Sequence, residues 1–146
     1  RYENGCIAWE RRNHYMTRWI RHNVRDRTLT PMSMPGITTN VKERTLSFVP
    51  GLRPVRARFS CVPRRFVGKL ASQLQTGDLV FFASTRKHLD VFHCGIIVRD
   101  DNRILLRHAL RSRGAVVEQE LDDFLKANRT AGLIIARPNH KIVSRG

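Results

Sequence analysis

Two histidines in the second half of the chain have the side-chain chemistry and the spacing that general acid–base catalysis requires. His93 lies in the stretch Val91-Phe92-His93-Cys94-Gly95, where alternation predicts a strand with His93 on the less apolar face and Phe92 and Cys94 on the other. A histidine held on a strand makes a good general base because its unperturbed pKa lies near neutrality. Gly95 leaves room for another backbone or a ligand to approach the imidazole closely.

The second histidine, His108, is predicted to lie beside His93. The turn Asp100-Asp101-Asn102 predicts an antiparallel pairing centred near residue 101, which brings position 108 roughly opposite position 94. Two neighbouring imidazoles on one face match a catalytic base and the polar residue that orients it, the outer two members of a Cys-His-polar triad. Two hydrogen-bonded structural histidines explain the same spacing, and the sequence leaves both interpretations open.

The cysteines and the other histidines do not form a recognisable set of metal ligands. Cys6, Cys61 and Cys94 stand at wide, irregular spacings without a CxxC pair, so neither a disulfide framework nor a zinc site is expected. No HxxxH or HExxH spacing places two histidines on one helix face, so we expect no metal and no cofactor. Cys94 is predicted to be a small core residue, and Cys61, which precedes Val62-Pro63, resembles an activated thiol only superficially.

The elements that must position these residues are strands with a few short helices. Apolar runs and alternating patterns predict strands at residues 6–9, 79–83, 91–98, 104–109, 115–117 and 133–136. Amphipathic spacing predicts helices at residues 13–23, 64–74 and 121–127. Residues 28–60 are rich in proline and glycine, which predicts a long excursion or irregular strands. The order of elements predicts an α+β fold on a curved antiparallel sheet, formed by a single domain that covers residues 1–146.

The chain is strongly basic, and its charge is unevenly distributed. Twenty-seven basic residues, 22 of them arginine, stand against twelve acidic residues and give a net charge of +15. Residues 1–73 hold fifteen basic and four acidic side chains, so a polyanion is expected to contact mainly the N-terminal half. Solvated surface charge explains the same composition equally well. No apolar run is long enough to span a membrane, so we expect no transmembrane segment.

Several short motifs, taken in order, resemble those of a known family. The stretch Gln75-Thr76-Gly77-Asp78-Leu79-Val80-Phe81-Phe82, followed by His93-Cys94-Gly95-Ile96 and Arg107-His108-Ala109, resembles the core of NlpC-type papain-like peptidases. Arg12-Asn13-His14-Tyr15, Trp19-Ile20 and the closing Arg137-Pro138 are more closely similar to the N-acetylmuramoyl-L-alanine amidase-like branch. The similarity extends over nearly the whole chain and implies a papain-like core.

The resemblance implies roles for five residues. It gives His93 the position of the base and His108 the position that orients it, and it places His14 and Tyr15 in a segment of the family's substrate cleft. Asp90, just before the base strand, either lines that cleft or caps a turn. The family's nucleophile is a cysteine at a helix start upstream of the His14 segment. Because this chain begins after that point, we expect the nucleophile to lie outside these 146 residues.

Three functions follow as expectations. The first is a cysteine amidase or endopeptidase that cleaves amide bonds of peptidoglycan or its peptide stem, in the periplasm or cell envelope. The second is a catalytically inactive peptidase-fold module whose arginine-rich N-terminal half binds a polyanion such as RNA, teichoic acid or lipopolysaccharide. Such a module acts alone or as part of a large assembly. The third is a structural or interaction subunit in which the histidines are retained without a catalytic role.

Overall fold

A six-stranded sheet organises the part of the chain that the structure describes, residues 7–32 and 35–139. The structure is a computed structural model. All neighbouring strands of the sheet run antiparallel. From one edge to the other the strands are β1 (Leu29–Pro31), β8 (Gly132–Pro138), β4 (Leu79–Ala83), β5 (Val91–Asp100), β6 (Arg103–Leu110) and β7 (Ala115–Glu120).

The central strand β4 is apolar because both of its faces are covered. Val80 and Phe82 belong to the larger core cluster on one face, and Phe81 belongs to a second cluster on the other. A strand that is buried on both sides has a continuous apolar run rather than an alternating one. The strand predicted at residues 79–83 is therefore confirmed.

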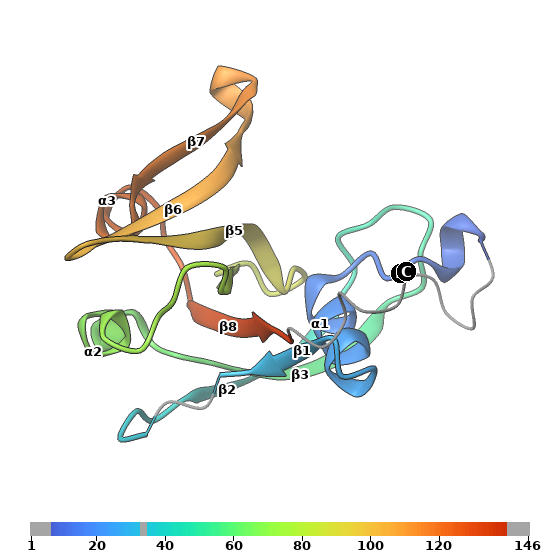
Figure 1. The fold of residues 1–146 in the computed structure, drawn as a ribbon. Coiled ribbons are helices and arrows are strands. Elements are labelled where there is room, and N and C mark those ends of the chain that lie inside the picture. The colour runs from blue at the N-terminus through green and yellow to red at the C-terminus, as the bar shows by residue number, and fades with distance from the viewer. Residues whose placement is uncertain (1–6, 33–34, 140–146) are drawn as a thin grey trace, which may run out of the picture.

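Three α-helices lie among the described residues, two on one face of the sheet and one on the other. α2 (Val67–Ala71), which follows the 3-10 turn η3 (Arg64–Phe66), and α3 (Leu121–Ala127) pack against the face that carries Phe82. α1 (Met16–Arg25) packs Ile20 against the face that carries Phe81. Figure 1 shows α2 and α3 at one side of the molecule and α1 at the other. The fold is α+β, as the sequence predicted.

Within the described ranges, no helix combines the length and the apolar character that crossing a membrane requires.

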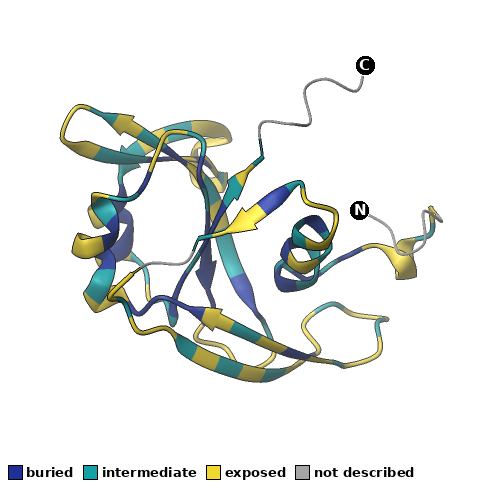
Figure 2. Cartoon of the chain, turned by 60° about the horizontal axis from the view of Figure 1, so that its bottom comes forward, coloured by how far each residue is buried: buried dark blue, intermediate teal, exposed yellow. Residues whose placement is uncertain are grey.

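A two-stranded hairpin occupies the stretch that the sequence predicted as an excursion or irregular strands. β2 (Asn40–Leu46) and β3 (Val55–Cys61) pair over seven residues each. Along both strands exposed residues alternate with less exposed ones (Figure 2). The inward residues Leu46 and Ala57 form a small core with Tyr15. The prediction of irregular structure was wrong because the flanking prolines and glycines concealed a regular period of two.

The expected strand at residues 6–9 is also wrong in the part that can be described. Cys6 lies outside the described residues, and Trp9 begins the 3-10 turn η2 (Trp9–Arg11). A second such turn, η4 (Arg111–Arg113), connects β6 to β7. Four alternating residues are too few to distinguish a strand from a turn.

A buried ion pair joins two of the motifs that carry the family resemblance. Asp78 at the start of β4 is 1% exposed. Arg137 on β8 donates from Nε to Asp78 Oδ1 at 2.7 Å and from a terminal nitrogen to Oδ2 at 2.9 Å. The backbone N–H of Gln75 also donates to Asp78 Oδ2, at 2.8 Å. Because two parallel hydrogen bonds fix the planes of both groups, the pair holds the end of β8 against the turn before β4.

Candidate active site

His93 on β5 and His108 on β6 form a hydrogen-bonded pair of imidazoles. Nε2 of His93 lies 2.8 Å from Nδ1 of His108, and the ring planes meet at 87° with centroids 4.9 Å apart. The hairpin pairs Ile96 with Arg107, and this register, carried one step further, places His108 opposite Gly95. The predicted register, with position 108 opposite position 94, is therefore confirmed to within one residue.

A bulge at the start of β5 brings Phe92 to the face of the sheet that carries His93. Phe82 pairs with His93, whereas the next residue of β4, Ala83, pairs with Val91, so Phe92 is the inserted residue. His93 therefore shares a face with Phe82, and Phe92 packs against the same core cluster. The predicted placement of His93 on the less apolar face was wrong, because His93 alternates with Ile97 on the core side while Cys94 and Ile96 are exposed. Its placement opposite Phe92 was wrong because strict alternation does not anticipate an inserted residue.

Gly95 lets the two strands that carry the histidines approach closely. A Cβ atom on residue 95 would lie 2.5 Å from Leu106 Cδ1, 2.8 Å from the carbonyl oxygen of Arg107 and 3.2 Å from the Cβ of His108. The first two distances are shorter than any van der Waals contact, so a side chain at this position would push β6 away. The space that the sequence predicted beside this glycine is filled by a neighbouring strand.

Phe124 on α3 covers both imidazoles. Its ring centroid lies 5.2 Å from that of His93, with the planes 23° apart, and 5.4 Å from that of His108, with the planes at 74°. Phe82 lies behind it, with the two phenyl centroids 4.4 Å apart. These stacked and edge-on arrangements are favourable for aromatic rings and shield one side of the pair from water, while His93 remains partly exposed. Phe124 was not predicted as part of the site, although its place on the apolar side of the helix at 121–127 indicated that it would be buried.

Burial lowers the pKa of both histidines. Desolvation lowers the pKa of His93 below its ordinary value of 6.5, and the neighbouring His108 lowers it further. Desolvation also lowers the pKa of His108, whose side chain is 3% exposed. Both imidazoles are therefore mainly neutral at pH 7. In a pair of neutral rings, one nitrogen donates the shared hydrogen bond and the other accepts it.

The shared bond decides which nitrogen of His93 can react. Nε2 faces His108, so Nδ1 is the ring nitrogen left for a reacting group. For Nδ1 to accept a proton, Nε2 must carry the hydrogen and donate it to His108, which then carries its own hydrogen on Nε2. That Nε2 of His108 is buried and has no hydrogen-bond partner among the described residues. The arrangement can orient a base, but it does not place a negative charge beside it.

His14 and Tyr15 lie just before α1, away from the core that surrounds the histidine pair. Tyr15 is 2% exposed and packs with Leu46, and its hydroxyl accepts a hydrogen bond from the backbone N–H of Val49 at 3.2 Å. His14 is half-buried, and its Nε2 lies 2.6 Å from the carbonyl oxygen of Trp9. Tyr15 is thus a core residue, whereas His14 borders an open pocket of about 340 Å³.

Asp90 connects the start of β5 to the first turn of α1. Its side chain is 1% exposed. Oδ2 accepts hydrogen bonds from the backbone N–H and the hydroxyl of Thr17 at 2.7 and 2.6 Å, and Oδ1 accepts one from the N–H of Val91 at 2.8 Å. The carboxylate satisfies an N–H group that the helix itself leaves unpaired, at the positive end of the helix dipole. The sequence left two roles open for Asp90, lining the substrate cleft or capping a turn. This geometry favours a capping role, and the element that Asp90 caps is a helix rather than a turn.

Neither described cysteine has the surroundings of an activated nucleophile. Cys94 is exposed and pairs across the sheet with Phe81, which belongs to the face opposite the histidine pair. Cys61 is 1% exposed and donates to the carbonyl oxygen of Ala131 at 3.6 Å. Desolvation raises the pKa of both thiols, which disfavours the reactive thiolate. The prediction that Cys94 is a core residue was wrong, because the face of β5 that carries it is open at this point.

The histidine pair is arranged for a hydrogen bond rather than for a metal. The two facing nitrogens are 2.8 Å apart, whereas two nitrogens bound to one tetrahedral zinc ion lie roughly 3.3 Å apart. Across residues 7–32 and 35–139, no three His, Cys, Asp or Glu side chains are grouped closely enough to hold a metal ion.

Comparison with known proteins identifies the family. The family model described as AmiA-like, N-acetylmuramoyl-L-alanine amidase-like, matches residues 1–133. The chain therefore belongs to the N-acetylmuramoyl-L-alanine amidase-like family, and the resemblance recognised in the sequence motifs is confirmed. No curated protein matches the sequence.

Solved structures show the same fold. An N-acetylmuramoyl-L-alanine amidase from Bacteroides uniformis is 24% identical with a TM-score of 0.76, and the match covers 95% of this chain and 70% of that one. A putative xylanase from Bacteroides fragilis is 22% identical with a TM-score of 0.76, over 94% of this chain and 71% of the other. A Legionella pneumophila protein is 17% identical with a TM-score of 0.72, over 94% and 66% of the two chains. At these identities the similarity establishes the fold alone.

Proposed function

We propose that this chain is the part of a cysteine amidase or endopeptidase domain that carries the catalytic base, and that the domain cleaves amide bonds of peptidoglycan. The observation that carries the proposal is the hydrogen-bonded pair of His93 and His108, and membership of an amidase-like family supports it. The domain has a papain-like, NlpC-type core with a curved sheet, and its thiol nucleophile comes from outside these 146 residues. A peptidoglycan substrate puts the reaction in the periplasm or the cell envelope.

The proposed reaction uses His93 to move protons. Nδ1 of His93 takes the proton of the thiol, and the thiolate attacks the carbonyl carbon of the amide. The protonated imidazole then gives this proton to the leaving amine, and a thioester remains. In the second half, His93 takes a proton from water, hydroxide attacks the thioester, and the departing thiolate regains the proton. His108 holds the ring and the tautomer of His93 through the 2.8 Å bond in both halves.

The lowered pKa of His93 suits this role. A neutral imidazole is present at pH 7 and can accept the thiol proton. Its conjugate acid, destabilised by burial, returns the proton readily to the amine. His14 takes the substrate-side role in this proposal, because it borders an open pocket. Tyr15 and Asp90, both buried, contribute by positioning the segment that carries His14.

The test is an assay of the complete gene product on purified peptidoglycan. Newly exposed amino groups and soluble fragments would be measured for the unmodified protein and for His93→Ala. Loss of a general base should reduce the rate by roughly 100-fold or more. His22→Ala is the matched control, because His22 pairs with Asp26 at 3.1 Å near the end of α1 and has no place in the mechanism. Full cleavage by a folded His93→Ala protein would refute the proposal.

A second candidate function is binding of a polyanion, and one surface feature favours it. A groove of about 610 Å³ beside the β2–β3 hairpin is lined by Arg21, Arg44, Arg56 and Arg58, with Glu43 the one acid among its described lining residues. We call it the hairpin groove. Arginine forks pair well with phosphate oxygens, and the +15 charge would attract RNA or another polyanion to this surface. In this alternative the chain is an inactive module of the same fold.

A further inference from the structure

A second groove opens beside the proposed catalytic base. It encloses about 520 Å³ and is lined by Phe48, Ser84, Arg86, Leu89, Phe92 and Arg129, among others. Phe92, the bulge residue of β5, links the groove to the histidine pair, since its ring centroid is 6.5 Å from that of His93. We call this site the base-side groove. The groove therefore begins one residue before the proposed base along β5, and His93 itself is not among its described lining residues.

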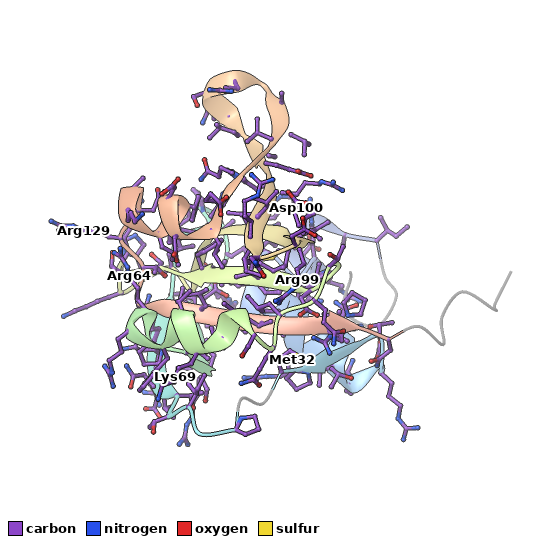
Figure 3. The ribbon with its side chains drawn as sticks, turned by 60° about the vertical axis from the view of Figure 1, so that its left-hand side comes forward. Met32, Arg64, Lys69, Arg99, Asp100 and Arg129 are labelled. Atoms are coloured by element: carbon purple, nitrogen blue, oxygen red, sulfur yellow. The ribbon has the colours of Figure 1, made fainter. Side chains whose placement is uncertain are left out.

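The groove is positively charged. Arg86 and Arg129 both have exposed side chains, and Figure 3 shows Arg129 projecting outward from the segment after α3. No aspartate or glutamate is among its described lining residues. Two guanidinium groups without an acidic neighbour attract an anion, and each presents the planar fork that pairs with a carboxylate.

The loop that carries Arg86 is held in place before any ligand binds. Arg44 on β2 donates to the carbonyl oxygens of Arg86 and Leu89 at 2.5 and 2.6 Å. The backbone N–H of Ser47 donates to the carbonyl oxygen of His88 at 3.1 Å. These bonds involve the carbonyl of Arg86 rather than its guanidinium, so the side chain is free to meet a ligand on a fixed backbone. A preorganised loop loses little entropy on binding.

The floor of the groove is apolar and partly aromatic. Phe48 is 46% exposed, and its ring stacks on that of His88 with centroids 5.6 Å apart and planes 12° apart. Leu89 and Phe92 continue this surface toward the base. Apolar contacts of this kind suit the methyl and methylene groups of a short peptide, with the arginines placed to meet its charged groups.

We infer that the base-side groove binds the free carboxylates of a peptide substrate through Arg86 and Arg129, and that the chain prefers acidic stem peptides to amidated ones. This inference rests on the proposed function, because it assigns the groove to the same substrate. The combination of two exposed arginines, a fixed loop and an apolar floor beside His93 carries it. The hairpin groove shares no described lining residue with the base-side groove, and the two are linked only through Arg44, which lines the first and holds the loop of the second.

The experiment measures binding rather than cleavage. The chain would be titrated with N-acetylmuramoyl-L-alanyl-D-glutamic acid, and separately with the same compound carrying carboxamides in place of both glutamate carboxylates, by NMR or calorimetry. We expect the acid to bind roughly 100-fold more tightly than the diamide, because the diamide loses two charge-assisted contacts worth about tenfold each. Arg86→Gln and Arg129→Gln each remove one of these contacts, so each should weaken binding of the acid by roughly tenfold and leave binding of the diamide unchanged.

Arg113→Gln is the matched control, because it removes the same charge from the exposed turn η4, at the far end of the β6–β7 hairpin. Thermal unfolding of each variant shows whether it remains folded. Equal binding of acid and diamide, no binding of either, or equal losses in all three variants would overturn the inference. Because cleavage is not measured, such a result leaves the proposed function to its own test with His93→Ala.

Discussion

The residue beside the proposed base is a second imidazole, and this choice affects the strength of the base. A carboxylate in that position would stabilise the imidazolium by its charge and raise the pKa of His93. Neutral His108 offers a hydrogen bond without a negative charge, and Phe124 packs against both rings. His93 is therefore a weak base with a strong conjugate acid, and the energetic benefit of His108 lies in orientation.

We predict that His93 titrates below 6.5 and that His108→Asn raises its pKa. The asparagine oxygen can still accept a hydrogen bond from His93, but the second titrating imidazole, which lowers the pKa of His93, is gone. NMR titration of the histidine ring signals, assigned with His93→Gln, measures both values. A pKa at or above 6.5 in the unmodified protein, or no rise in His108→Asn, would contradict the prediction.

We predict that Gly95→Ala destabilises the chain and separates the two imidazoles. The added methyl group would overlap the Leu106 side chain and the carbonyl of Arg107, and overpacking of this kind costs about 1–3 kcal/mol. Gly68→Ala is the control, because nothing lies within 4 Å of its added Cβ in helix α2. Urea unfolding should show a loss of stability for the first variant, and a small gain or no change for the second. Equal stabilities would show that β6 moves away at little cost.

Sequence reasoning at the residue scale succeeded where local geometry decides the outcome. The short turn after β5 fixes the hairpin register, so the neighbourhood of His93 and His108 could be predicted. The face on which His93 lies could not, because it depends on which side of the sheet α2 and α3 cover. The bulge that brings Phe92 to the same face depends on how β4 pairs with β5. Nor could the contact of Phe124 with both rings, since it joins a helix to strands that are distant in sequence.

At the scale of elements, Asp90 shows how one side chain positions a helix. We predict that Asp90→Asn lowers the free energy of unfolding by about 1–3 kcal/mol, because its single amide oxygen cannot accept the hydrogen bonds from both Thr17 and Val91. Asp101→Asn is the control, since Asp101 is exposed in a turn with φ 48°, a conformation that asparagine also adopts readily. Thermal or denaturant unfolding would measure both. A cost no larger than that of the control would show that Thr17 is satisfied without the carboxylate.

The elements that were predicted well are those with one dominant pattern. The strand at 79–83 and the helix at 121–127 have the predicted bounds, because each combines an unbroken apolar pattern with clear ends. The β2–β3 hairpin was missed because only β3 has an apolar inward face. In β2 the less exposed positions include Lys42 and Arg44, and Val41 is exposed, so its sequence shows no apolar alternation. Its small core depends on Tyr15, which comes from another part of the chain. Such a pattern becomes readable only when the partner is known.

At the scale of the whole molecule, the two candidate functions use different surfaces. The histidine pair lies between the sheet and α3, whereas the hairpin groove lies beside β2, β3 and α1. In that groove Arg58 pairs with Glu43 at 3.5 Å, and Arg21 donates to the carbonyl oxygen of Arg58 at 3.1 Å. Neither contact consumes all the donors of its arginine. Binding of a polyanion and cleavage of an amide are therefore compatible in one chain, and variants can separate them.

We predict that a single-stranded RNA oligomer binds this chain with an affinity that falls steeply as salt rises, and that the hairpin groove supplies part of the slope. For single strands, each phosphate contact contributes about 0.7 to the slope of log K against log salt, so Arg56→Gln with Arg58→Gln should reduce that slope by about 1.4. Arg111→Gln with Arg113→Gln removes the same two charges from η4 and should change the slope much less. Fluorescence anisotropy at several salt concentrations measures each slope.

Equal reductions in both double variants would mean that the +15 charge acts through the whole surface rather than through this groove. A slope near zero would remove the polyanion function, because recognition of a phosphate backbone cannot be independent of salt.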